Sequence, residues 1–149
     1  MAKFKYRMQS ILDIKSKMES QAKMEYAQAR NRLTKEEEKL KDLRERKKGY
    51  ETEGRGLLNG GLVVRDIMDN KLAVSRMDEY IKKQLIQVNV AEKNLETVRM
   101  RLTNIMKERK SHESLKEKAF EQFMKDENSK ESKEIDELTS YTYGQKEDE

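Results

Sequence analysis

The residues that could carry out chemistry are few in this chain, and they do not form a recognisable set. There is one histidine, His112, and no cysteine among the 149 residues. Acid–base or metal chemistry requires several titratable or ligating groups that converge in a partly enclosed pocket. Glycines crowd between Gly49 and Gly61, but the Lys and Ser or Thr that complete a phosphate-binding loop do not follow them. We therefore predict a protein that is not an enzyme, without catalytic, cofactor-binding or metal-binding residues.

The composition favours long helices over a compact globular domain. Charged residues make up 42% of the chain and hydrophobic residues only 34%, and proline and tryptophan are absent. Such a composition is typical of coiled coils when it is accompanied by a helical period, and of disordered chains when it is not. No apolar run reaches the ~20 residues that a membrane span needs. We expect a cytoplasmic protein that does not insert into the membrane.

The strongest pattern is a seven-residue repeat that extends from Ile67 to Phe123. Alternating steps of three and four residues reach seventeen positions, of which twelve are apolar, and no Pro or Gly interrupts them. This period predicts a helix with a narrow apolar seam that pairs with another helix in a left-handed coiled coil. The predicted seam on this helix includes Val74, Ile81, Val88, Leu95, Val98, Leu102 and Ile105.

A second, less regular apolar stripe begins near Met8. We predict that Met18, Ala22, Leu33 and Leu40 form its part of the seam. Gly54, Gly56, Gly60 and Gly61 lie within eight positions, and each glycine costs a helix about 1 kcal/mol relative to alanine, so a turn is expected there. The apolar residues near this turn either pack across its tip, which we favour, or form an exposed docking patch.

These patterns predict an all-α fold in which two long helices form an antiparallel coiled-coil hairpin. We expect a single domain over residues 1–149, with a first helix at 5–52, a glycine-rich turn at 53–63, a second helix at 64–139 and a frayed acidic tail at 140–149. Partners should have numbers that sum to roughly 115, so that Met18 would face Val98. The second helix would then project beyond the first, because its seam becomes polar from Arg109 onward.

The charge distribution leaves two alternative functions open. Residues 1–50 carry an excess of seven positive charges, whereas residues 126–149 carry an excess of six negative charges. A nucleic-acid binder would gather basic and aromatic side chains on one face, but here Lys and Glu are interspersed. A structural homodimer of parallel helices would also account for the repeat. In a parallel homodimer, however, the seam need not become polar where the first helix runs out of residues.

Segments near both ends of the chain resemble the flagellar export protein FliJ family. The resemblance lies in the stretch from Phe4 to Asp13 and in Glu25 to Leu33, and again in Lys107 to Lys110 and Lys133 to Leu138. It implies a non-enzymatic coiled coil similar to the central stalk of rotary ATPases. It also implies three partners, namely the hexameric flagellar export ATPase, the cytoplasmic domain of the export gate protein and the export chaperones. Location would be cytoplasmic and peripheral to the inner face of the cell membrane, without nucleic-acid binding.

The same resemblance indicates two groups of contact residues. Leu43, Tyr50 and Met77 match the residue types at the family's positions for the export-gate contact. Ala73, Tyr80 and Gln84 lie at further positions of that contact but differ in side chain from the family. Arg46 stands where some members have an aromatic residue. The end that carries the termini would enter the ATPase ring, where charge supplies attraction and orientation. Candidates for that contact are Lys3, Lys5, Arg7, Arg109, Lys110, Lys116 and Lys118.

Overall fold

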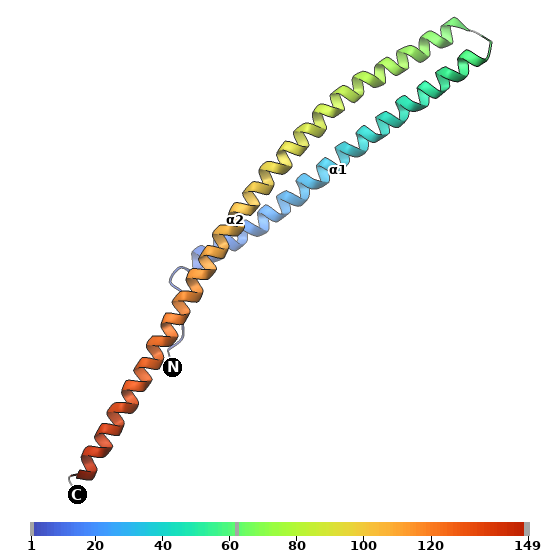
Figure 1. Cartoon of the computed structure of the whole chain (residues 1–149). Helices are drawn as coiled ribbons and strands as arrows, with labels where there is room; N and C mark the ends of the chain where they lie inside the picture. The colour runs from blue at the N-terminus through green and yellow to red at the C-terminus, as the bar shows by residue number, and fades with distance from the viewer. Residues whose placement is uncertain (1, 62, 148–149) are drawn as a thin grey trace. The chain divides into compact units, whose positions relative to one another are not determined.

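The fold consists of two α-helices in the part of the chain that the structure describes. The structure is a computed structural model that describes residues 2–61 and 63–147. Helix α1 extends over Gln9–Asn59 (51 residues) and helix α2 over Val64–Glu147 (84 residues) (Figure 1). This confirms the predicted all-α class with a longer second helix. Among the described residues, neither helix contains a stretch that is long and apolar enough to cross a membrane.

The start and end of α1 and the end of α2 differ from the predicted boundaries. Helix α1 begins at Gln9 and continues through Gly49, Gly54 and Gly56 to Asn59, so the expected turn at 53–63 is too long. Leu62 lies outside the described residues. Pairing with α2 offsets the helix cost of these glycines, because packing contributes more to helix stability than propensity does. Helix α2 continues to Glu147 and not to residue 139, since no proline stops it; residues 148–149 lie outside the described part.

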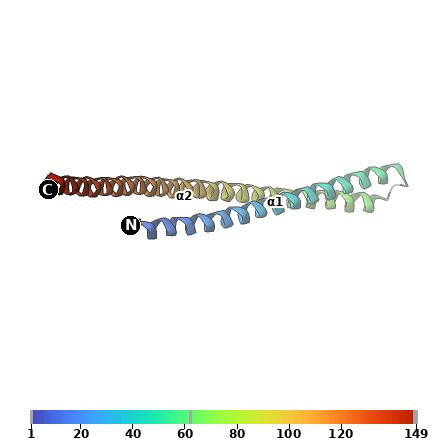
Figure 2. The same ribbon diagram turned by 90° about the horizontal axis from the view of Figure 1, so that it is seen from below.

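The chain divides into two compact units, which we describe separately. The hairpin unit is Ser20–Thr103, and the terminal unit combines Met1–Glu19 with Asn104–Glu149. Within the hairpin unit, α1 and α2 lie side by side and antiparallel, joined by the short connection after Asn59 (Figures 1 and 2). Within the terminal unit, α2 continues past the start of the chain, and its side chains from residue 128 to 145 are all exposed.

The core of the hairpin unit is a narrow seam. All eleven repeat positions of α2 from Ile67 to Leu102 are buried or half-buried. Of the predicted seam residues, Ala22, Leu40 and Val88 are buried, as are Ala29 and Ala91. The other predicted seam residues in this unit are half-buried: Leu33, Val74, Ile81, Leu95, Val98 and Leu102. The small alanine side chains allow the two backbones to approach closely in these layers.

The seam of the terminal unit follows a different phase on α1 from the predicted one. Leu12 and Ile105 are buried, whereas Met18, which we expected in the seam, is 40% exposed. The seam positions here are taken by Leu12, Lys15 and Glu19. Apolar residues alone therefore indicated the wrong stripe, because Lys15 and Glu19 form ion pairs across the two helices.

The register of the two helices is also shifted from the predicted one. Residues that pair across the two helices have numbers that sum to between 120 and 128, and not to roughly 115. In the hairpin unit the pairs are Tyr50 with Asn70, Glu36 with Gln84, Lys47 with Asp78 and Glu25 with Arg101. In the terminal unit they are Lys15 with Glu108 and Glu19 with Arg109. The predicted pairing of Met18 with Val98 is therefore wrong. The shift follows from the later end of α1, which lies at Asn59 and not at residue 52.

A side chain at Gly54 would crowd Asn70, whereas one at Gly56 would meet no other group. A Cβ atom added at Gly54 would lie 3.1 Å from Asn70 Cγ and closer still to its Oδ1, but one added at Gly56 would meet nothing within 4 Å. We expect Gly56→Ala to raise the free energy of unfolding by about 0.5–1 kcal/mol through helix propensity. Gly54→Ala should lack this gain or be destabilising, because Asn70 must move. Urea unfolding of both variants checks this, and equal stabilisation by the two would contradict it.

Candidate partner-binding surface

One edge of the hairpin unit combines residues from both helices into shallow grooves. The first groove is lined by Leu43, Arg46, Tyr80, Lys83, Gln84, Ile86 and Gln87. A second groove nearer the turn is lined by Tyr50, Glu53, Leu57, Asp66, Asp69, Asn70 and Ala73. We call the surface formed by Leu43, Arg46, Tyr50, Ala73, Met77, Tyr80 and Gln84 the Tyr80 edge. Both grooves are open and shallow, so they suit a protein surface better than an enclosed small molecule.

The residues that the sequence suggested for the gate contact define the Tyr80 edge, and all of them except Met77 line one of its two grooves. Leu43 and Tyr50 of α1 and Met77 of α2 are half-buried at seam positions. Tyr80, by contrast, is 48% exposed and flanks the seam. The register therefore brings residues that are about thirty apart in sequence onto one edge. Such a surface exists only while α1 and α2 remain paired.

Polar side chains within the seam hold the two helices beneath this edge. Asn70 Nδ2 donates a hydrogen bond to the carbonyl oxygen of Tyr50 (2.8 Å). Gln84 Nε2 donates to the carbonyl oxygen of Glu36 (2.9 Å) and to its carboxylate (2.5 Å). Because these groups are partly buried, a shift of register would leave them without partners. Asn70 and Gln84 are polar residues at positions of the seven-residue repeat that are otherwise mostly apolar. Such polar residues in a seam are the sequence signal for residues that fix the register of paired helices.

A further ion pair crosses the helices next to these hydrogen bonds. Lys47 Nζ lies 2.6 Å from Asp78 Oδ1, and this hydrogen bond raises the pKa of Lys47 above its ordinary value. Farther along the hairpin unit, Arg101 Nη1 lies 3.3 Å from Glu25 Oε2. Both pairs join α1 to α2, and neither was predicted from the sequence. The sequence alone does not show which charged residues pair across the helices, because that depends on the register.

The terminal unit contains a cluster of charged residues that join α1 to α2. Lys15 Nζ lies 2.7 Å from Glu108 Oε2, and this hydrogen bond lowers the pKa of Glu108. Arg109 forms ion pairs with Glu113 (2.7 Å) and with Glu19, and hydrogen bonds to these two carboxylates raise the pKa of Arg109. Arg109 was a candidate for contact with the ATPase ring. Its guanidinium group forms these ion pairs within the unit, and its contact with the ring stays a prediction.

The other basic candidates remain accessible. Lys3, Lys5 and Arg7 precede α1 and are exposed, as are Lys110 and Lys118, whereas Lys116 is half-buried. Next to them, the ring of Phe4 packs against Phe120 and Phe123, with centroid distances of 5.2 and 5.4 Å. These aromatic contacts hold the start of the chain against α2. These contacts between the three phenylalanines were not predicted from the sequence.

The lone histidine lies within the terminal unit and away from any metal-binding group. His112 is half-buried, and its Nδ1 has no hydrogen-bond partner among the described residues. Within residues 2–61 and 63–147, no three His, Cys, Asp or Glu side chains are placed to hold a metal ion.

Fold and surface together define a two-helix coiled-coil protein that presents composite grooves and basic side chains. The sequence pattern of the flagellar FliJ protein family matches residues 4–148, and the chain belongs to that family. Members of this family are non-enzymatic components of the flagellar type III export apparatus. Among solved structures, a YscO homolog, CT670, from Chlamydia trachomatis is similar in fold, with a TM-score of 0.76, 24% identity and 99% of each chain covered. No curated protein matches the chain.

Proposed function

We propose that this protein is a non-enzymatic coupling stalk of the flagellar export apparatus. In this role it binds the hexameric export ATPase, promotes ring assembly and activity, and contacts the cytoplasmic domain of the export gate protein and the export chaperones. The protein would act in the cytoplasm, held at the inner face of the membrane through the apparatus. Family membership over residues 4–148 supports the general role.

The observation that carries the proposal is that the two units have surfaces of different character. The hairpin unit has the Tyr80 edge, in which apolar and aromatic residues of both helices meet. The terminal unit has the exposed cations Lys3, Lys5, Arg7, Lys110 and Lys118. Aromatic residues in grooves provide affinity at protein interfaces, whereas exposed charges mainly steer and orient a partner. We assign the gate contact to the Tyr80 edge and the ATPase contact to the terminal unit.

The test of this function is the activity of the cognate export ATPase. We expect that adding the purified protein raises both ATP turnover and the fraction of ATPase in hexamers, as measured by a coupled assay and by light scattering. A variant with Lys3, Lys5 and Arg7 replaced by glutamate should require a higher concentration for the same effect, and high salt should act in the same direction. If the wild-type protein changes neither turnover nor hexamer fraction, the proposed function is wrong.

A further inference from the structure

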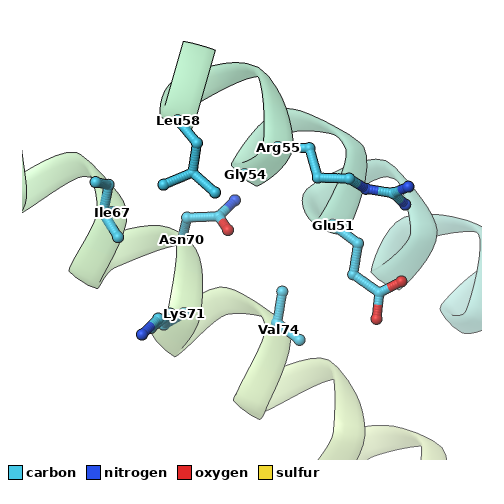
Figure 3. Close-up of a pocket in the computed structure, with 8 residues that line it drawn as sticks. All are labelled: Glu51, Gly54, Arg55, Leu58, Ile67, Asn70, Lys71 and Val74. Atoms are coloured by element: carbon cyan, nitrogen blue, oxygen red, sulfur yellow. The ribbon is translucent and has the colours of Figure 1, made fainter. Parts of the chain in front are cut away.

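The hairpin unit has a third groove near its turn, which shares only Asn70 with the two grooves of the Tyr80 edge. It has a volume of about 530 Å³ and is lined by Glu51, Gly54, Arg55, Leu58, Ile67, Asn70, Lys71 and Val74. Figure 3 shows Leu58 of α1 and Ile67 and Val74 of α2 around this space, with Gly54 behind Asn70. We call it the Leu58 groove. It exists because α1 continues as a helix through Gly54 and places Leu58 opposite α2.

Exposed apolar side chains are interspersed in sequence with the residues of α2 that line the Leu58 groove. The exposed fractions are 61% for Leu58, 67% for Val64, 61% for Met68 and 55% for Leu72. The last three are spaced four residues apart, so they form one stripe on the helix. The favoured prediction that residues near the turn pack across its tip is therefore wrong for Leu58 and Val64. Neighbouring exposed apolar residues of this kind mark an interaction surface.

The charges at the turn distinguish the Leu58 groove from the Tyr80 edge. Arg55 and Lys71 line the Leu58 groove, and neither has an ion-pair partner among the described residues. Its one acidic residue, Glu51, lies 3.8 Å from Lys47. The groove of the Tyr80 edge nearest the turn has the opposite character, because three carboxylates and no basic residue line it: Glu53, Asp66 and Asp69. The two grooves thus favour partners of opposite charge.

From this arrangement we infer that the Leu58 groove is a docking site for an acidic segment of a partner protein. An apolar side chain of that segment would enter the space between Leu58, Ile67 and Val74. Carboxylates on either side of it would face Arg55 and Lys71. Burial of the apolar side chain provides the affinity, and the charge pairs at the rim provide orientation and selectivity. This inference does not depend on the ATPase or gate contacts proposed above.

The probe for this site is a displayed library of short random peptides, selected on the immobilised full-length protein. We expect enrichment of peptides that combine a bulky apolar residue with flanking Asp or Glu. Synthetic copies of the enriched peptides should bind Arg55→Glu/Lys71→Glu at least about fivefold more weakly than wild type, because reversed rim charges repel the carboxylates. The matched control is Lys48→Glu/Arg65→Glu, which makes the same charge change outside the groove and should bind as wild type.

Several outcomes would overturn the inference. They are the absence of enrichment, enrichment of neutral or basic peptides, and equal binding to the two double variants. Circular dichroism establishes that each variant keeps its helices, and Leu58→Ser provides a second variant that removes the apolar contact without changing charge. Self-association of the wild type that is lost in Arg55→Glu/Lys71→Glu would show that the groove binds a second copy of this chain, and it would also overturn the inference.

Discussion

Replacing Tyr80 by alanine is expected to weaken binding of the export gate's cytoplasmic domain by at least about tenfold, because aromatic residues at groove centres commonly contribute ~2 kcal/mol or more to interfaces. Tyr80 lines the groove beside Leu43 and Gln84 and is 48% exposed. It flanks the seam, so its removal should leave the pairing of α1 and α2 intact. Isothermal titration calorimetry with the isolated gate domain measures the change.

The matched control for Tyr80 is Leu72→Ala. Leu72 is also on α2 and 55% exposed, but it belongs to the apolar stripe beside the Leu58 groove. Its replacement should alter gate binding less than about twofold, as expected for a residue outside the interface. Unchanged binding by Tyr80→Ala, or an equal loss in both variants, would show that the Tyr80 edge is not the gate contact.

Replacing Leu40 by alanine is expected to lower the free energy of unfolding by about 2–3 kcal/mol, the cost of a cavity in a core that cannot fully collapse. Leu40 is 8% exposed in the seam of the hairpin unit. Met24→Ala is the control, because Met24 is 64% exposed on the same helix and its replacement should cost under about 0.5 kcal/mol. Chemical denaturation followed by circular dichroism gives both values. A similar loss in the two variants would contradict the seam assignment.

The sequence predicted the second helix more completely than the first for a physical reason. On α2, apolar residues occupy most repeat positions and no breaker interrupts them, so a single period describes burial from Ile67 to Phe123. On α1, the seam includes Lys15, Glu19, Glu36 and Lys47, whose burial depends on partners across the hairpin. A reading of apolar residues alone therefore follows the exposed stripe that contains Ile11 and Ile14.

The turn and the register could not be located from propensity alone. Glycine lowers helix propensity, but Gly54 also removes a side chain where Asn70 approaches α1, and that benefit appears only in the folded pair. The resemblance to a family supplied the residues that define the Tyr80 edge, and their contact with the gate stays a prediction. It did not indicate the Leu58 groove, since a turn at 53–63 would leave no helix at Leu58 to form it.

The most direct test of the account is a disulfide between α1 and α2, because every proposed surface requires the chain to fold back on itself in one register. Ala29 and Leu95 occupy seam positions that the register, set by Glu25 with Arg101 and Glu36 with Gln84, places opposite each other, and each is replaced by cysteine. At high dilution they should crosslink within one chain, whereas Leu33→Cys with Lys83→Cys, which suits the register first predicted, should not. Crosslinks that form only between chains, or only in the second pair, would contradict the account.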